Sequence, residues 1–121
     1  MRKFIGLATL AICGLTAGSA GAVSTSINYI DLLPGTDLQA CLSEAETAMS
    51  SIGLSVMPRT ASAAWADSTQ RDRLFTIYCI PDRQIAVVVG SDADSDATDS
   101  VGNELDLLVD RFINPVNTGR K

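Results

Sequence analysis

The sequence predicts an α+β fold: a two-layer sandwich in which a small antiparallel sheet of about three strands carries two amphipathic helices on one face. Three observations lead to this prediction. Two runs rich in β-branched, aromatic and aliphatic residues flank a turn that contains proline, and the stretches before and after them repeat apolar residues at helical spacing. The order helix, short strand, hairpin, helix favours one sheet covered on one side.

Residues 73–90 are predicted to form a β-hairpin. The runs 74–80 and 85–89 have high β-propensity, and Pro81, Asp82 and Arg83 between them are typical of a turn. Side chains alternate between the two faces of a strand. The core-facing positions of the hairpin are therefore expected to be Phe75, Ile77, Cys79, Ile85, Val87 and Val89.

A first helix is predicted to begin at Thr36, which with Gln39 matches a capping box, and to end before Gly53. Leu54 can fold back onto the last turn, and residues 54–57 are apolar enough for a short strand that Pro58 ends. The apolar positions of the helix fall on one stripe: Leu38, Cys41, Leu42, Ala45, Ala48, Met49 and Ile52.

A second helix is predicted over residues 97–113, where Asn114 and Pro115 stop it. Gly102 lies close to its apolar face and can allow a close approach to the sheet. Residues 36–114 then form a single α+β domain, followed by a polar tail at 115–121. The apolar face of this helix comprises Val101, Leu105, Leu108, Val109, Phe112 and Ile113.

Two segments leave alternatives open. Residues 23–35 are either a flexible leader or an edge strand that includes Ile27 and Tyr29. Residues 59–72 form a helical turn or a loop, and the polar flank 67–70 favours the loop. Trp65, the only tryptophan, either packs onto the domain, which we favour, or stands exposed as an anchor for a partner.

Asp92, Asp94 and Asp96 are the only residues that resemble metal ligands. Their alternation matches the first, third and fifth positions of a calcium loop. Ala97 stands where the tight turn of such a loop needs glycine, and Asn103 where a bidentate glutamate should close the shell. We therefore expect no metal or other cofactor, and we expect Asp96 to cap the second helix instead.

Residues 1–22 have the three parts of a secretory signal peptide, with cleavage expected between Ala22 and Val23. The apolar run of this segment is shorter than the ~20 residues of a spanning helix, so no stable membrane insertion is expected after cleavage. The mature protein would be periplasmic or secreted. Cys13 leaves with the signal, and Cys41 and Cys79, on the apolar stripe and on the core face of the hairpin, are expected to form a disulfide.

The chain contains no histidine, which excludes Ser-His and Cys-His nucleophile pairs and every metal site that uses imidazole. Loss of the signal leaves seven basic and fourteen acidic residues, a net charge of −7. Nucleic acid is a poor partner for such a protein, whereas a basic protein is electrostatically compatible.

Cys41 on a helix, Ile77-Tyr78-Cys79 on a central strand, the run Val87-Val88-Val89-Gly90 and a final amphipathic helix together resemble small exported bacterial α+β proteins of uncharacterised function, which carry one helix-to-strand cysteine pair. The resemblance covers most of residues 36–112. It implies an exported bacterial protein and assigns no catalytic or binding residue.

Three functions compete. The first is a non-enzymatic binding or accessory module at the cell envelope, with inhibition of a basic envelope protein as its most specific version. The second is a calcium-binding module that uses the acidic loop 92–99. The third, a hydrolase that uses carboxylates alone, is the least favoured because the sequence places no two acids in an evident cleft.

Overall fold

The computed structural model describes residues 23–115, so the predicted signal peptide, its last residue Ala22 and residues 116–121 lie outside the described chain. The elements follow in the order β1 (Ser24–Asp31), α2 (Leu38–Ser51), β2 (Ser55–Val56), β3 (Ala63–Asp67), β4 (Arg73–Ile80), a 3₁₀ turn η1 (Pro81–Arg83), β5 (Ile85–Asp92) and α3 (Thr98–Ile113).

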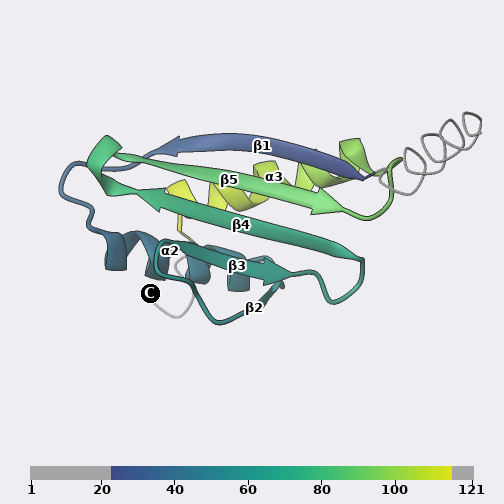
Figure 1. Ribbon diagram of the computed structural model, residues 1–121, viewed down its shortest axis with the longest axis horizontal. Helices are drawn as coiled ribbons and strands as arrows, with labels where there is room; N and C mark the ends of the chain where they lie inside the picture. The colour runs from purple at the N-terminus through teal and green to yellow at the C-terminus, as the bar shows by residue number, and fades with distance from the viewer. Residues whose placement is uncertain (1–22, 116–121) are drawn as a thin grey trace, which may run out of the picture.

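The five strands form one antiparallel sheet in the order β1-β5-β4-β3-β2, and both helices lie on the same face of it (Figure 1). Helix α2 packs on β2, β3 and β4, while α3 packs on β1 and β5. The predicted α+β class and the position of the helices are confirmed. The sheet is larger than the predicted three strands, because residues 24–31 form an edge strand and residues 63–67 form a strand rather than a loop.

Helix α2 follows the predicted stripe, with Cys41, Leu42, Ala45, Ala48 and Met49 buried. Its N-cap is Asp37, whose carboxylate accepts a hydrogen bond from the Ala40 N–H at 2.8 Å, so the predicted Thr36 cap is wrong by one position. At its end, Gly53 takes a left-handed φ of 87°. The N–H of Gly53 then donates to Ser50 and that of Leu54 to Met49, a Schellman motif.

The hairpin forms as predicted, but the predicted core face of its second strand is wrong. Phe75, Ile77 and Cys79 of β4 are buried, and their partners across the ladder are Gly90, Val88 and Ala86. The turn η1 and the left-handed Gln84, with φ 57°, place Ile80 opposite Ile85. Paired residues share a face. Ile85, Val87 and Val89 therefore point away from the helices.

Gly90 allows α3 and the sheet to approach each other closely. A Cβ atom built at this position would lie 2.6 Å from Cε1 of Phe75 and 3.2 Å from Cγ1 of Val101. The side chain of Phe75 thus occupies the space that the glycine leaves. Gly102, the glycine expected to have this role, has room, since its Cβ would meet only the Ser26 hydroxyl at 3.7 Å.

The two layers are linked covalently and by ion pairs. The sulfurs of Cys41 in α2 and Cys79 in β4 lie at disulfide distance, with their Cα atoms 6.2 Å apart, as the prediction requires. Arg59, in the loop after β2, makes a two-pronged contact with Glu46 of α2, at 3.0 and 2.6 Å. Both contacts hold α2 against the half of the sheet formed by β2, β3 and β4.

Candidate functional site

The face of the sheet that carries no helix has a continuous apolar and aromatic surface. The ladder places Ile27, Val89, Thr76 and Trp65 in one row across four strands. A second row joins Tyr29, Val87 and Tyr78. We call these two rows the outer face: Ile27, Tyr29, Trp65, Thr76, Tyr78, Val87 and Val89.

Large side chains of the outer face are open to solvent. Ile27 is 67% exposed, Tyr29 61% and Tyr78 46%. Trp65 is partly exposed, and its indole N–H donates to the carbonyl of Pro58 at 2.8 Å. The tryptophan thus lies beside the loop before β3 on the outer face, and not in the core.

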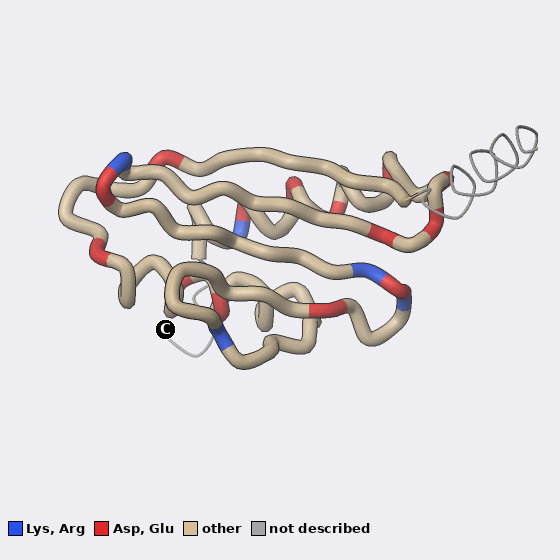
Figure 2. Tube along the Cα trace, viewed as in Figure 1, with Lys and Arg blue, Asp and Glu red and all other residues tan. Residues whose placement is uncertain are grey.

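Charge is excluded from the middle of this surface. Lys, Arg, Asp and Glu lie at the ends of the strands, in the connections and on the helices, while the central parts of β1, β5 and β4 carry none (Figure 2). The chain after residue 22 contains seven basic residues and all fourteen acidic ones. The centre of the outer face is therefore uncharged, although the protein as a whole is strongly acidic.

The acidic loop forms an ion-pair network. Asp92, the last residue of β5, is buried and accepts hydrogen bonds from Nε of Arg73 at 2.8 Å and Nε of Arg71 at 3.2 Å. Arg73 is also buried, and its other nitrogens donate to Glu104 at 2.6 Å and to Ser100 at 2.9 Å, both in α3. The network joins β4, β5 and α3 at one end of the sheet.

The two buried charges stabilise each other. Burial lowers the pKa of Arg73, but its hydrogen bonds to Glu104 and Asp92 outweigh that effect and raise it above the ordinary value. The hydrogen bond from the Asp94 N–H holds the pKa of Asp92 below its usual value despite burial, with further lowering by Arg73 and Arg71. Asp92 is thus already neutralised by the protein's own arginines.

The other two acidic residues of the loop are Asp94, which contacts nearby residues, and Asp96, the predicted cap of α3. One oxygen of Asp94 accepts the Asp96 N–H at 2.9 Å, and its other oxygen lies 4.0 Å from Arg71. The predicted cap by Asp96 is wrong: the N-cap position of α3 is Ala97, whose N–H donates to the hydroxyl of Ser24 at 3.1 Å. Within residues 23–115 no three His, Cys, Asp or Glu side chains are grouped so that they could hold a metal ion.

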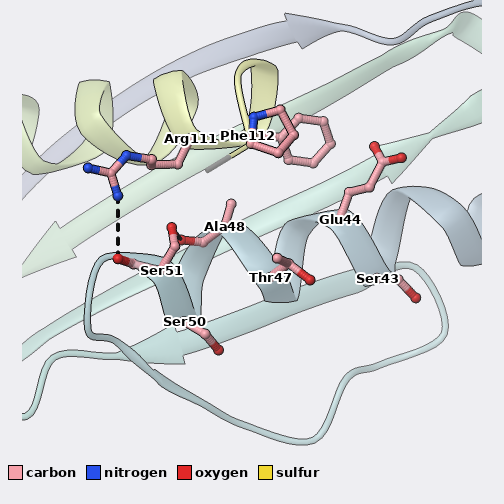
Figure 3. Close-up of a pocket in the computed structure, with 9 residues that line it drawn as sticks. Ser43, Glu44, Thr47, Ala48, Ser50, Ser51, Arg111 and Phe112 are labelled. Carbon is pink, nitrogen blue, oxygen red and sulfur yellow. Dashed lines mark hydrogen bonds between the residues drawn. The ribbon is translucent and has the colours of Figure 1, made fainter. Parts of the chain in front are cut away.

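A shallow groove of about 420 Å³ lies between the two helices (Figure 3). Its walls carry hydroxyls of Ser43, Thr47 and Ser50, with Glu44 and Arg111 on opposite sides. Arg111 donates to the carbonyl of Ser51 at 3.4 Å, which bridges the helices. The hydroxyl of Ser43 accepts a hydrogen bond from Nη2 of Arg59 at 3.5 Å.

The sequence placed only part of the candidate surface. The sequence indicates a possible edge strand with Ile27 and Tyr29, but it predicts Val87 and Val89 in the core, and it places Trp65 in a helical turn or a loop that packs onto the domain. The number of residues in the hairpin turn determines which face of the sheet these residues occupy. Because β5 has apolar residues on both of its faces, its sequence pattern does not reveal which face is buried.

None of the helices in the described chain is long and apolar enough to cross a membrane. Comparison of the chain with protein-family models and with curated proteins finds no match.

Proposed function

We propose that this protein is a non-enzymatic binding module, exported to the periplasm or secreted, whose outer face receives a basic protein partner. The observation that carries the proposal is the exposure of Ile27, Tyr29 and Tyr78 on one uncharged surface. Exposed apolar patches of this kind, rimmed by polar residues, are typical of protein interaction sites. Aromatic side chains also supply most hot spots of such interfaces.

Charge supports the choice of a basic partner. The seven basic and fourteen acidic residues of the chain after residue 22 give a net charge of −7. Such a field accelerates association with a basic protein and disfavours acidic ones. Occlusion of a functional surface on a basic envelope protein, which is inhibition, is the most specific version of the proposal.

The cysteine pair supports an oxidising compartment, since disulfides persist in secreted and periplasmic proteins. This agrees with the tripartite signal at residues 1–22 and with the resemblance to small exported bacterial α+β proteins, both of which belong to the proposal. The calcium alternative gains no support from Asp92, which two arginines already occupy.

The test compares two lysine substitutions that change the net charge equally. Tyr78→Lys places a cation in the middle of the outer face, whereas Leu107→Lys places it on α3, at a residue 41% exposed and on the other layer. Wild-type protein, incubated with a bacterial envelope extract and cross-linked, should capture a protein with a pI above about 9.

Capture should be lost in Tyr78→Lys, retained in Leu107→Lys, and weakened by salt in the wild type because exposed charges are screened. Equal capture by both variants, or capture of an acidic protein only, would contradict the proposal. Circular dichroism on both variants establishes that they fold.

A further inference from the structure

The two edges of the sheet differ in how they are protected. At one edge β2 has two residues, and Pro58 follows it closely. At the other edge β1 has eight residues, pairs with β5 without a bulge from Ser24 to Asp31, and contains no lysine or proline. Short strands, charged side chains (lysine above all), proline and bulges are the usual means by which proteins protect an edge against pairing. Of these, β1 has only one charge, Asp31 at its last position.

The hydrogen bonds of β1 identify which of its backbone groups face outward. The Leu32 N–H donates to Gln84 of the neighbouring connection at 2.8 Å. In an antiparallel ladder such pairs recur at every second residue, so the even positions of β1 bond to β5. The N–H and C=O groups that point away from the sheet are therefore those of Thr25, Ile27, Tyr29 and Asp31.

One of these outward groups is covered by the strand itself. The Tyr29 N–H donates to Oδ1 of Asn28, its own neighbour, at 2.8 Å, and both residues are exposed. This bond confirms that Tyr29 turns its N–H away from β5. A side-chain bond of this kind is easily exchanged for a backbone bond from an added strand, because the amide of Asn28 can return to water.

We propose that β1 accepts an extended segment of the basic partner as a sixth strand of the sheet. This inference rests on the proposed function and specifies how the partner is held. Backbone hydrogen bonds supply affinity in strand addition, and the alternate side chains of the added strand supply specificity.

The surroundings of β1 define the sequence of that segment. On one side an added strand extends the outer face next to Ile27 and Tyr29, which favours apolar side chains. On the other side it runs beside α3, where Gly102 lies against Ser26. Asp99 and Asp106, three residues before and four after Gly102, share that side of the helix and are exposed.

The segment should therefore alternate apolar and basic residues. A second copy of this chain is disfavoured as the added strand, since its β1 contains no basic residue and its net charge is the same −7.

The experiment measures binding of a labelled Val-Lys alternating peptide to the full protein by fluorescence anisotropy. A Val-Glu alternating peptide and a peptide with the same Val and Lys composition but no alternation are the controls. Only the first should bind. Equal binding of the scrambled peptide, or no binding of the alternating one, would overturn strand addition.

Two variants of β1 should change the affinity in opposite directions. Ile27→Pro removes an outward N–H that has no partner in β5, so the fold should persist while binding weakens by about tenfold or more. Ile27→Val keeps the N–H and should bind like the wild type. Asn28→Ala frees the Tyr29 N–H and should tighten binding, by up to about fivefold. Asn103→Ala, which removes an exposed amide from α3, is the control and should leave the affinity unchanged.

The same peptide separates this inference from the proposed function. If Tyr78→Lys abolishes binding while Ile27→Pro leaves it unchanged, the outer face binds the partner and strand addition is wrong. If Ile27→Pro abolishes binding while Ile27→Val and Tyr78→Lys do not, the backbone of the edge strand binds the peptide and the centre of the outer face does not. Sedimentation of the protein alone tests whether a second copy of the chain pairs with β1. A dimer that Ile27→Pro dissociates would show such pairing and would overturn the choice of a basic partner.

Discussion

The hydroxyl of Ser24, at the first position of β1, accepts the backbone N–H of Ala97, which precedes the first turn of α3. The same hydroxyl donates to the carbonyl of Asp94 at 2.6 Å and lies 3.3 Å from that of Thr98. A residue at the start of the described chain thus fixes the backbone that leads into the last helix, across more than seventy positions of sequence.

Ser24→Ala should lower the free energy of unfolding by about 1 kcal/mol, because the Ala97 N–H and the Asp94 carbonyl lose a buried hydrogen-bond partner. Urea denaturation followed by circular dichroism measures the change. Thr25→Ala, at the exposed neighbouring position, is the control and should have a smaller effect. Equal stability of Ser24→Ala and the wild type would mean that the hydrogen bonds of this hydroxyl contribute nothing.

Gly90→Ala should destabilise the protein by about 1–3 kcal/mol, because the added methyl group overlaps the ring of Phe75. Gly102→Ala is the matched change in α3, where the methyl group has room and alanine favours the helix by up to about 1 kcal/mol. Thermal denaturation should therefore place the two variants on opposite sides of the wild type. A stabilised Gly90→Ala would contradict the close contact with Phe75.

Reduction of the Cys41–Cys79 pair should remove about 4 kcal/mol of stability in the chain-entropy model, since the bond closes a loop of 38 residues. Denaturation midpoints with and without reductant measure this. The double variant Cys41→Ala and Cys79→Ala should show no response to reductant. Titration of two free thiols in the denatured, unreduced chain that begins at residue 23 would refute the bond.

Acid should destabilise the protein through Asp92. Its pKa is lower in the folded state than the ordinary 3.8, so the unfolded chain binds the proton more readily. The stability that ionised Asp92 contributes is fully present at pH values well above 3.8, and it is lost as the pH falls through the folded-state pKa of this residue. Glu46, whose pKa the hydrogen bond from Arg59 also lowers, adds to the same acid limb.

Urea midpoints between about pH 6 and pH 3 should fall steeply in the wild type and less steeply in Asp92→Asn, which starts from a lower stability. Glu46→Gln measures the smaller, more exposed contribution separately. Parallel curves for Asp92→Asn and the wild type would show that Asp92 has the same pKa in both states.

Millimolar calcium should leave the melting temperature unchanged, because a bound ion would have to displace Arg73 and Arg71 from Asp92. Magnesium at the same ionic strength is the control. A calcium-specific increase that disappears in Asp94→Ala would establish a site in the loop 92–99 and favour the calcium-binding module.

The parts of the fold that local sequence determines were predictable. Helix α2 has a complete apolar stripe and Gly53 in the left-handed position that ends it. Strand β3 was missed because Ala63, Ala64 and Ala66 have low β-propensity. Ala64 and Ala66 are fully buried in the cluster that contains Ala45 and Ala48 of α2, so tertiary packing, and not propensity, selects these small residues.

The candidate site was less predictable than the fold. Ile85, Val87 and Val89 are as apolar as the buried Ala86 and Val88, and only the four residues between Ile80 and Ile85 determine which set faces the helices. The role of Asp92 depends on Arg73, nineteen positions earlier, which the ladder brings directly opposite it. Neither relationship has a local signature.

Strand β4 is anchored at both ends, by Arg73 to α3 and by Cys79 to α2. This arrangement matters under mechanical load. A force that pulls residues 23 and 115 apart can detach β1 and α3, but the bond between Cys41 and Cys79 transmits the tension directly and keeps the 38 residues of its loop from lengthening. In a stretching experiment, about 130 Å of contour length, at roughly 3.4 Å per residue, would be released only after the disulfide is reduced.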